Sequence, residues 1–481
     1  MGVSHERITD LLGKAAATIK AAPGTEPWQY GWAFSDYRRS DSAALPSSDG
    51  PVTMDSDGIS AYEEAVEALL SHAVVRDRWD NKEIWAVAAS LIVAASETGT
   101  TTGFIARNLP RILKPSPALV IFPVANVKWE EAPMALGSKC AIGNAGAEFT
   151  DLVSKLGGRA SSAQKVISEF TEQQKYEQPP TCFAMLVPGQ QDLAFRQASR
   201  QFEMLVDISL LLDISKEEHG LHFSREAWNR PGVRGLTLDR GAVERGMRGK
   251  KSAVELFSQP LIYDELGKSG SHHWYTASPV PLHAILSHER LRHAVLKSLV
   301  DPGSIYRRLR VAGKWFSEAF WASNPDDATL ALGVALDALI GAKSALPGRA
   351  MRERFALLHD TPSTRASRAK AYEELYRVRS IVAHGGISSK VEEEGFIKSF
   401  QQEVTWAAWR LLAVGADFSV SSDADLDEAF EGLRWGTKNW PTDGEGNEIN
   451  TMLELDTEKD GDTAPLQPCG SEMIRTEESA N

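Results

Sequence analysis

Cysteine is scarce in this sequence. Its 481 residues include three cysteines, none of them at a paired spacing: Cys140, Cys182 and Cys469. Structural zinc sites and the disulfide frameworks of small secreted domains both rely on cysteines at short, paired spacings. The sequence therefore argues against a disulfide framework and against a metal site, and it favours a cytoplasmic protein.

Long apolar runs are also absent. The longest strongly apolar stretch, residues 84–95, is interrupted by Ser90, and it falls far short of the ~20 residues that span a bilayer. The first residues, MGVSHERITDLLGKAAATIKAA, lack the apolar segment and small-residue cleavage site of a secretory signal. We therefore expect no membrane segment and no secretion.

Several motifs of cofactor chemistry are missing. The sequence has no G-x-x-x-x-G-K-[ST] loop, no dinucleotide glycine fingerprint and no H-E-x-x-H helix, which would bind phosphate, dinucleotide and zinc respectively. It has no G-x-S-x-G nucleophile elbow either. We therefore expect no cofactor, and energy-coupled, redox and metalloprotease activities have no motif to support them.

The net charge of −13 is unevenly distributed. Residues 416–481 hold 17 acidic and 4 basic residues, whereas residues 303–415 hold 12 acidic and 16 basic residues. The acidity thus belongs to the C-terminal segment, and the segment before it is mildly basic. A basic segment of this kind permits contacts with nucleic-acid phosphates.

Hydrophobic spacing predicts a multidomain α+β protein. A mixed α/β N-terminal region precedes an all-α helical bundle, and an acidic, largely disordered tail follows. Short β-branched runs such as ALVIFPVA alternate with amphipathic helices in the second quarter of the chain, a pattern typical of an α+β domain. The predicted regions are an irregular and helical segment at 1–117, the α+β domain at 118–302, the bundle at 303–415 and the tail at 416–481.

The bundle shows almost uninterrupted helical periodicity. Short connections between its helices imply antiparallel neighbours, and the fourth helix ends at Gly385-Gly386. The predicted helices are 306–323, 325–340, 349–360, 367–384 and 392–414.

The end of the fourth helix carries two residues suited to RNA cleavage. Arg379 and His384 lie five residues apart in AYEELYRVRSIVAHGG, about 140° apart around a helix. Attack of a 2′-hydroxyl on phosphate needs proton transfer and charge stabilisation, which histidine and arginine supply. The spacing alone is not specific, because Arg379 can equally pair with a carboxylate inside the bundle.

The wider pattern is more specific. The string Tyr376-x-x-Arg379-Ser380-x-x-x-His384-Gly385 resembles the signature of the HEPN superfamily, particularly of its ApeA-like branch. Upstream, ATLALGVALDALIG is similar to the family's second helix, and its Asp337 matches a position that is usually Glu. RAMRERFALLHD and YRRLRVAGKWFSEAFW resemble two further helices, so the resemblance extends over the whole HEPN-type helical bundle.

The resemblance implies a metal-independent endoribonuclease that leaves 2′,3′-cyclic phosphate ends. Such proteins are commonly homodimers in which two R-x-x-x-x-H motifs face one cleft, and many are toxins or antiphage effectors. By matched position, Arg379 would stabilise phosphate charge and His384 would act as general acid and base. Ser380 would position the backbone or the histidine, and Asp337 would orient Arg379 or His384.

Further arginines are candidates for RNA contacts. Arg377 lies beside the motif, and Arg307 and Arg308 lie on the first bundle helix. Each can meet an RNA phosphate or belong to a solvated helix face. The acidic tail is either a solvated appendage or a segment that occupies the bundle in place of RNA.

Two hypotheses for the function stay open. In the first, the N-terminal region senses an unknown trigger and controls an endoribonuclease; residues 118–210 resemble the strand-rich segment that precedes the HEPN domain in ApeA-like proteins. In the second, the bundle is a catalytically inactive HEPN module that mediates dimerisation or binds a partner.

Overall fold

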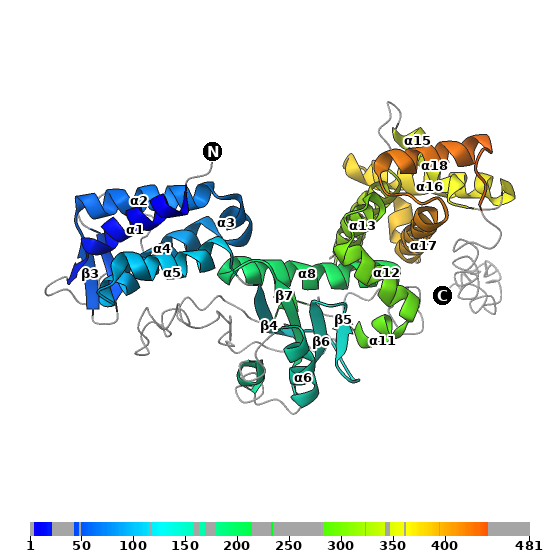
Figure 1. The fold of residues 1–481 in the computed structure, drawn as a ribbon. Coiled ribbons are helices and arrows are strands. Elements are labelled where there is room, and N and C mark those ends of the chain that lie inside the picture. The colour runs from blue at the N-terminus through cyan, green and yellow to red at the C-terminus, as the bar shows by residue number, and fades with distance from the viewer. Residues whose placement is uncertain are drawn as a thin grey trace, which may run out of the picture. The chain divides into compact units, whose positions relative to one another are not determined.

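The computed structural model divides the chain into two compact units, residues 1–206 with 226–284 and residues 207–225 with 285–481 (Figure 1). None of the helices in the described ranges has the length and apolarity of a membrane span. The structure describes residues 4–21, 43–47, 50–115, 117–157, 163–168, 179–213, 232–233, 280, 282–322, 324–341, 347–359, 362–393 and 395–440.

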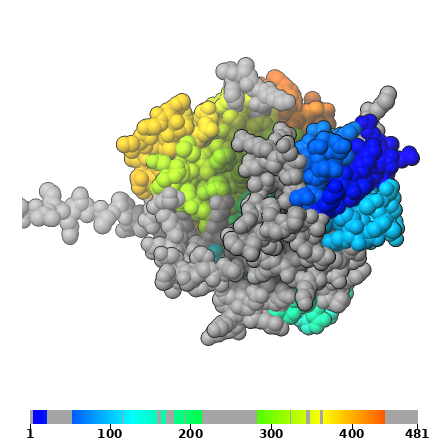
Figure 2. All heavy atoms as spheres, turned by 90° about the vertical axis from the view of Figure 1, so that its left-hand side faces the viewer, coloured from blue at the N-terminus to red at the C-terminus, as the bar shows by residue number. Residues whose placement is uncertain are grey.

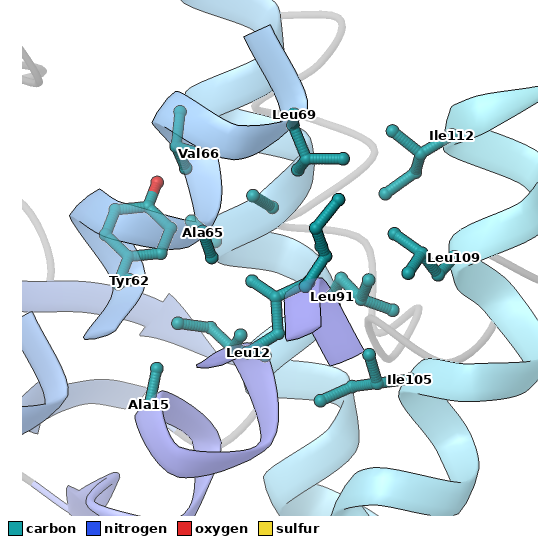
Figure 3. Packing of buried hydrophobic residues seen from close by; sticks show 14 of the residues in the cluster. Leu12, Ala15, Tyr62, Ala65, Val66, Leu69, Leu91, Ile105, Leu109 and Ile112 are labelled. Atoms are coloured by element: carbon teal, nitrogen blue, oxygen red, sulfur yellow. The ribbon is translucent and has the colours of Figure 1, made fainter. Parts of the chain in front are cut away.

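The first unit opens with a group of amphipathic helices. They pack through a mainly aliphatic core, in which Leu12, Leu91 and Leu109 lie close together (Figure 3). Part of their outer side is coloured from blue to cyan in Figure 2. Asp80 begins one of them with a capping box that includes Glu83. The helices are α1 (His5–Ala17), α2 (Ser56–Ser71), α3 (Ala73–Arg78), α4 (Asn81–Glu97) and α5 (Thr101–Leu113).

A small antiparallel sheet lies in the same N-terminal region. Its order is β1-β3-β2, and β2 pairs with β3 from Ala43↔Met54 to Ser47↔Gly50. The sequence predicts an irregular and helical segment at 1–117, and this sheet adds strands that the prediction did not include; residues 22–42 lie outside the described ranges. The strands are β1 (Lys20–Ala21), β2 (Ala43–Ser47) and β3 (Gly50–Met54).

A second antiparallel sheet confirms the strands predicted after residue 118. Its order is β5-β6-β7-β4-β8. Leu119 and Ile121 share a core with α6, whereas the ring of Phe122 contacts the rings of α8. Because successive strand residues point to opposite faces, α6 and α8 cover the two faces of this sheet. The elements are β4 (Ala118–Ala125), β5 (Met134–Leu136), β6 (Cys140–Asn144), α6 (Ala147–Lys155), β7 (Thr181–Val187), α8 (Gln191–Leu212) and β8 (Gly232–Val233).

The second unit confirms the predicted helical bundle. α14 packs against α13, α16 and α17, so α14 is its central helix. The last residues of α8, from Asp207 onward, and residues 285–287 of α11 (Leu282–Ser287) belong to this unit. The remaining elements are α12 (Glu289–Val300), α13 (Ser304–Phe320), α14 (Pro325–Ile340), α15 (Pro347–Leu357), α16 (Pro362–Ala383), the 3-10 turn η2 (Ser389–Glu392), α17 (Phe396–Asp417) and α18 (Asp423–Trp435).

The boundaries of the bundle differ from the sequence-based ranges at both ends. Residues 285–302 belong to the second unit, and α18 occupies part of the expected acidic tail. α18 forms because Ser422 and Asp425 make a capping box and Leu426 and Leu433 bury one face. Residues 441–481 lie outside the described ranges, so disorder of the tail stays a prediction for that part.

Candidate active site

The candidate site begins at the C-terminal end of α16. The Gly386 N–H donates to the Ile381 carbonyl at 2.9 Å, and the Gly385 N–H donates to the Val382 carbonyl at 3.0 Å. Gly385 has a φ of +75°, in the left-handed region that glycine adopts without strain. These paired bonds form a Schellman motif. The motif confirms the predicted end of the helix and makes His384 the C-cap residue of α16.

The motif residues occupy adjoining parts of the α16 surface. Tyr376, Ser380 and His384 are spaced by four residues, and each step of four turns about 40° around a helix, so they form one stripe. The side chains of Tyr376 and His384 are exposed and that of Ser380 is half-buried. Arg379 borders one side of the stripe and the exposed Arg377 the other. The imidazole of His384 is therefore accessible from solvent.

Arg379 is held against the neighbouring helix α14. Its Nη2 lies 3.4 Å from Oδ2 of Asp337, and the two side chains are 27% and 30% exposed. A Cβ placed on Gly333 would lie 2.5 Å from Cγ of Arg379, so the stem of the arginine lies where only a glycine leaves room. Gly333 and Asp337 are one helical turn apart, and together they fix where the guanidinium sits.

Partial burial affects the polar groups around this ion pair. Burial raises the pKa of the Asp337 carboxyl above its ordinary value, although the positive charge of Arg379 opposes the rise. Burial, and then the charge of Asp337, raises the pKa of the Tyr372 hydroxyl. Within the described structure, the Tyr372 hydroxyl and Nε of Arg379 are buried and have no hydrogen-bond partner. Arg379 thus retains unused donor capacity.

The arginines predicted to contact RNA fall into two groups, of which Arg307 and Arg308 form the first. Arg307 and Arg308 both bind the carboxylate of Asp423 at the start of α18. Arg308 also donates to the carbonyls of Ala338, Leu339 and Gly341, so it caps the end of α14. No hydrogen bond or ion pair joins either arginine to the motif within the described ranges, and their RNA contacts stay a prediction.

Arg377 differs from those two arginines. Its side chain is exposed, and it forms no ion pair with another residue that the structure describes. It therefore remains available to a phosphate, as the sequence predicted for it, although nothing in the structure tests that contact.

Three residues around the motif escaped the sequence reasoning as parts of the site. Gly333 gives Arg379 its place, Tyr372 lies beside Asp337, and Arg354 joins Arg308 at the end of α14 by donating to the Gly341 carbonyl. For Gly333 and Tyr372, spacing was the available signal. Gly333 precedes Asp337 by four residues and Tyr372 precedes Arg379 by seven, so each shares a helix face with its neighbour.

The arrangement places a proton-transfer group and an oriented cation five residues apart near the end of one helix. No group of three or more His, Cys, Asp or Glu side chains in the described part of the chain is placed to hold a metal ion. The chain matched no protein-family model, no curated protein and no solved structure.

Proposed function

We propose that the second unit is a HEPN-type bundle that cuts RNA without a metal ion, with Arg379 and His384 at its centre. One observation carries the proposal. An exposed histidine sits at a rigid, glycine-capped helix end, five residues from an arginine that an ion pair with Asp337 orients. The reaction requires a group that transfers protons and a positioned cation that binds the phosphate.

In the proposed reaction, the 2′-hydroxyl of a ribose attacks the adjacent phosphorus and the bond to the 5′ oxygen breaks. The 2′-hydroxyl loses its proton to a base, and the departing 5′ oxygen gains a proton from an acid. His384 serves in these transfers, and Arg379 donates hydrogen bonds to the phosphate oxygens as negative charge builds on them. The products carry a 2′,3′-cyclic phosphate and a 5′-hydroxyl.

Asp337 and Ser380 act through these residues. The Asp337 carboxylate holds the guanidinium of Arg379 from α14, which limits the rotation of a long side chain before RNA arrives. Ser380 lies one turn before His384, and its carbonyl accepts the His384 N–H at 3.2 Å, which helps to fix the backbone of the histidine. Both are positioning residues in this proposal.

The proposal includes a second copy of the chain and a control region. A homodimer would place two histidines at one cleft, so that one acts as base and the other as acid. The first unit would sense a trigger and regulate the cut, with RNA as the substrate and antiphage defence or toxicity as the outcome. The family resemblance is the support for each of these points.

One structural observation favours a second candidate function. The ion pair between Arg379 and Asp337 joins α16 to α14, and such a pair can serve the packing of the bundle alone. In that case the second unit is an inactive HEPN module that dimerises or binds a partner, and the motif is a structural relic.

Incubation with total RNA separates the two candidates. Purified protein in a buffer with EDTA is compared with His384→Ala, Arg379→Ala and His293→Ala. His293 is an exposed histidine of α12 in the same unit and serves as the matched control. The proposal predicts cleavage by wild type and His293→Ala, and a loss of about 100-fold or more in the two motif variants.

Equal cleavage by wild type and both motif variants would refute the site. Expression in growing cells gives an independent reading, because a nuclease should arrest growth and His384→Ala should relieve the arrest. Growth arrest that His384→Ala leaves unchanged would favour the inactive module.

A further inference from the structure

An aromatic column leads from the bundle core to the surface beside the motif. Tyr372 is 2% exposed and Tyr376 is 37% exposed. Their rings are stacked with a centroid separation of 6.0 Å and an interplanar angle of 22°. The ring of Tyr376 is therefore accessible to solvent, and its packing against Tyr372 helps to fix its orientation.

The outer ring lies next to the start of a second helix. A Cβ on Gly348, at the start of α15, would lie 3.5 Å from Cζ and 3.7 Å from the hydroxyl oxygen of Tyr376. An alanine at this position would touch the ring, so the ring lies close to α15 as well as against Tyr372. An exposed aromatic side chain that a buried ring already supports loses little conformational entropy when a flat ligand stacks on it.

Tyr376 also has a defined relation to the motif. It begins the stripe that continues through Ser380 to His384, and eight residues of helix separate it from the histidine by about 12 Å along the axis. Arg379 lies within one turn of it. A strand whose phosphate lies between Arg379 and His384 would carry its neighbouring base toward Tyr376.

We infer that Tyr376 is a stacking platform for one unpaired base of a single-stranded RNA, next to the phosphate that is cut. This inference rests on the proposed function and names its substrate class. Single-stranded RNA exposes base faces that stack on aromatic side chains, whereas the bases of double-stranded RNA are stacked within the duplex. The site therefore selects unpaired segments and tolerates different base sequences.

Binding is the readout that tests the platform. Full-length protein is titrated into a fluorescently labelled 20-nucleotide RNA of mixed sequence, 2′-O-methylated throughout so that it resists cleavage. Tyr376→Leu keeps an apolar side chain but removes the ring, and it should weaken binding by roughly 5- to 150-fold, the range for loss of one stacked base. Tyr376→Phe keeps the ring and should bind within about 2-fold of wild type.

The control is an exposed aromatic residue elsewhere in the same unit. Trp435 of α18 is 70% exposed, and Trp435→Leu should leave RNA affinity unchanged. Hydrogen exchange of α14 and α16 identifies any variant that has lost its fold. A fully paired duplex of the same sequence should bind wild type and Tyr376→Leu equally.

The outcomes distinguish the inference from the proposed function. Wild-type affinity of Tyr376→Leu for the single strand would overturn the platform and leave the cleavage proposal intact. A loss that Tyr376→Phe shares would also overturn it, because the ring would then not be the cause. Absence of RNA binding by wild type would contradict the inference and the proposed function together.

Discussion

The two units treat buried polar groups differently. In the helical core of the first unit, Asn108 donates to the Phe104 carbonyl, and the Tyr62 hydroxyl donates to the Trp85 carbonyl. In the second unit, within the described ranges, buried polar atoms without a hydrogen-bond partner occur on Ser304, Thr329, Tyr372, Arg379 and Gln401. A buried polar group left unpaired typically costs about 1–3 kcal/mol.

The contrast indicates that unpaired buried polar groups lower the stability of the second unit. The core of α1 to α5 is built mainly from aliphatic side chains, and the buried polar groups named above are hydrogen-bonded. The second unit keeps unpaired donors, and two of them, on Tyr372 and Arg379, lie at the candidate site. Natural proteins break packing rules mainly at functional sites, so this difference supports the choice of site.

The largest expected effect concerns the apolar core of the first unit. Leu91 of α4 is fully buried among the residues of Figure 3. Leu91→Ala should lower the free energy of unfolding by about 2–5 kcal/mol, because it removes apolar contacts and leaves a cavity. Hydrogen exchange measured in α4 and α5 reports the loss. A loss below about 1 kcal/mol would show that this core is loosely packed.

The next largest effect is expected from substituting one glycine in each unit. A Cβ on Gly103 in α5 would meet no atom within 4 Å, whereas a Cβ on Gly333 would collide with Arg379. Gly103→Ala should stabilise the protein by up to about 1 kcal/mol through helix propensity. Gly333→Ala should destabilise it by about 1–3 kcal/mol through overpacking and should also reduce RNA cleavage by displacing Arg379.

Denaturant unfolding and the cleavage assay check this pair. If Gly333→Ala gained stability and kept full cleavage, the position of Arg379 would not depend on the close approach of α14.

A matched pair of tyrosines tests the contrast in hydrogen bonding directly. Both rings are buried, but the hydroxyl of Tyr62 has a partner and that of Tyr372 has none in the described structure. Tyr62→Phe should lose about 0.5–1.5 kcal/mol, whereas Tyr372→Phe should be neutral or stabilising, because it removes a buried donor that is unpaired. Equal losses in thermal unfolding would mean that the Tyr372 hydroxyl is bonded in solution.

The smallest expected effect is the pH dependence of Asp337. Burial raises the pKa of the Asp337 carboxyl in the folded state above the ordinary Asp value of ~3.9. The stability that this shift contributes is therefore fully present below that ordinary value and is lost as pH rises through the raised pKa. Asp337→Asn lacks this titration. The stability of wild type relative to the variant should therefore fall across that pH window, by less than about 1 kcal/mol.

Unfolding midpoints of both proteins at several pH values measure this difference. A relative stability of wild type that rises with pH would show that attraction to Arg379 outweighs burial at this site.

Much of the second unit could be predicted from the sequence because its helices carry local signals. Pro325 follows Asn324, whose side chain caps the helix, and Gly341 ends it, so the bounds of α14 were predicted correctly. Gly385 likewise marked the end of α16. Each signal acts within one turn of helix, which is the range over which sequence reasoning is most secure.

Two elements escaped prediction although they carry comparable signals. α1 has a capping serine, Ser4, and buries Ile8 and Leu12 at helical spacing. α18 has the capping box of Ser422 and Asp425. The acidic charge of α18 resembles that of a disordered tail, and charge does not report which helix face is buried.

Features that arise between helices could not be read from spacing alone. The sequence left open whether Arg379 has an acidic partner, and the ion pair with Asp337 depends on how closely α14 approaches α16 at Gly333. The engagement of Arg307 and Arg308 by Asp423 depends on α18, which the prediction lacked. Tertiary contacts of this kind require the packed structure.

The most direct test of the Arg379 and His384 site uses one RNA substrate whose cleavage position has been mapped. A second substrate is identical except for a 2′-deoxyribose at the nucleotide that supplies the attacking hydroxyl. The account predicts that wild type cuts the first substrate to a 2′,3′-cyclic phosphate end and leaves the second uncut at that position, and that His384→Ala cuts neither. Cleavage of the deoxy substrate at that position, or a 3′-hydroxyl end on the product, would contradict it.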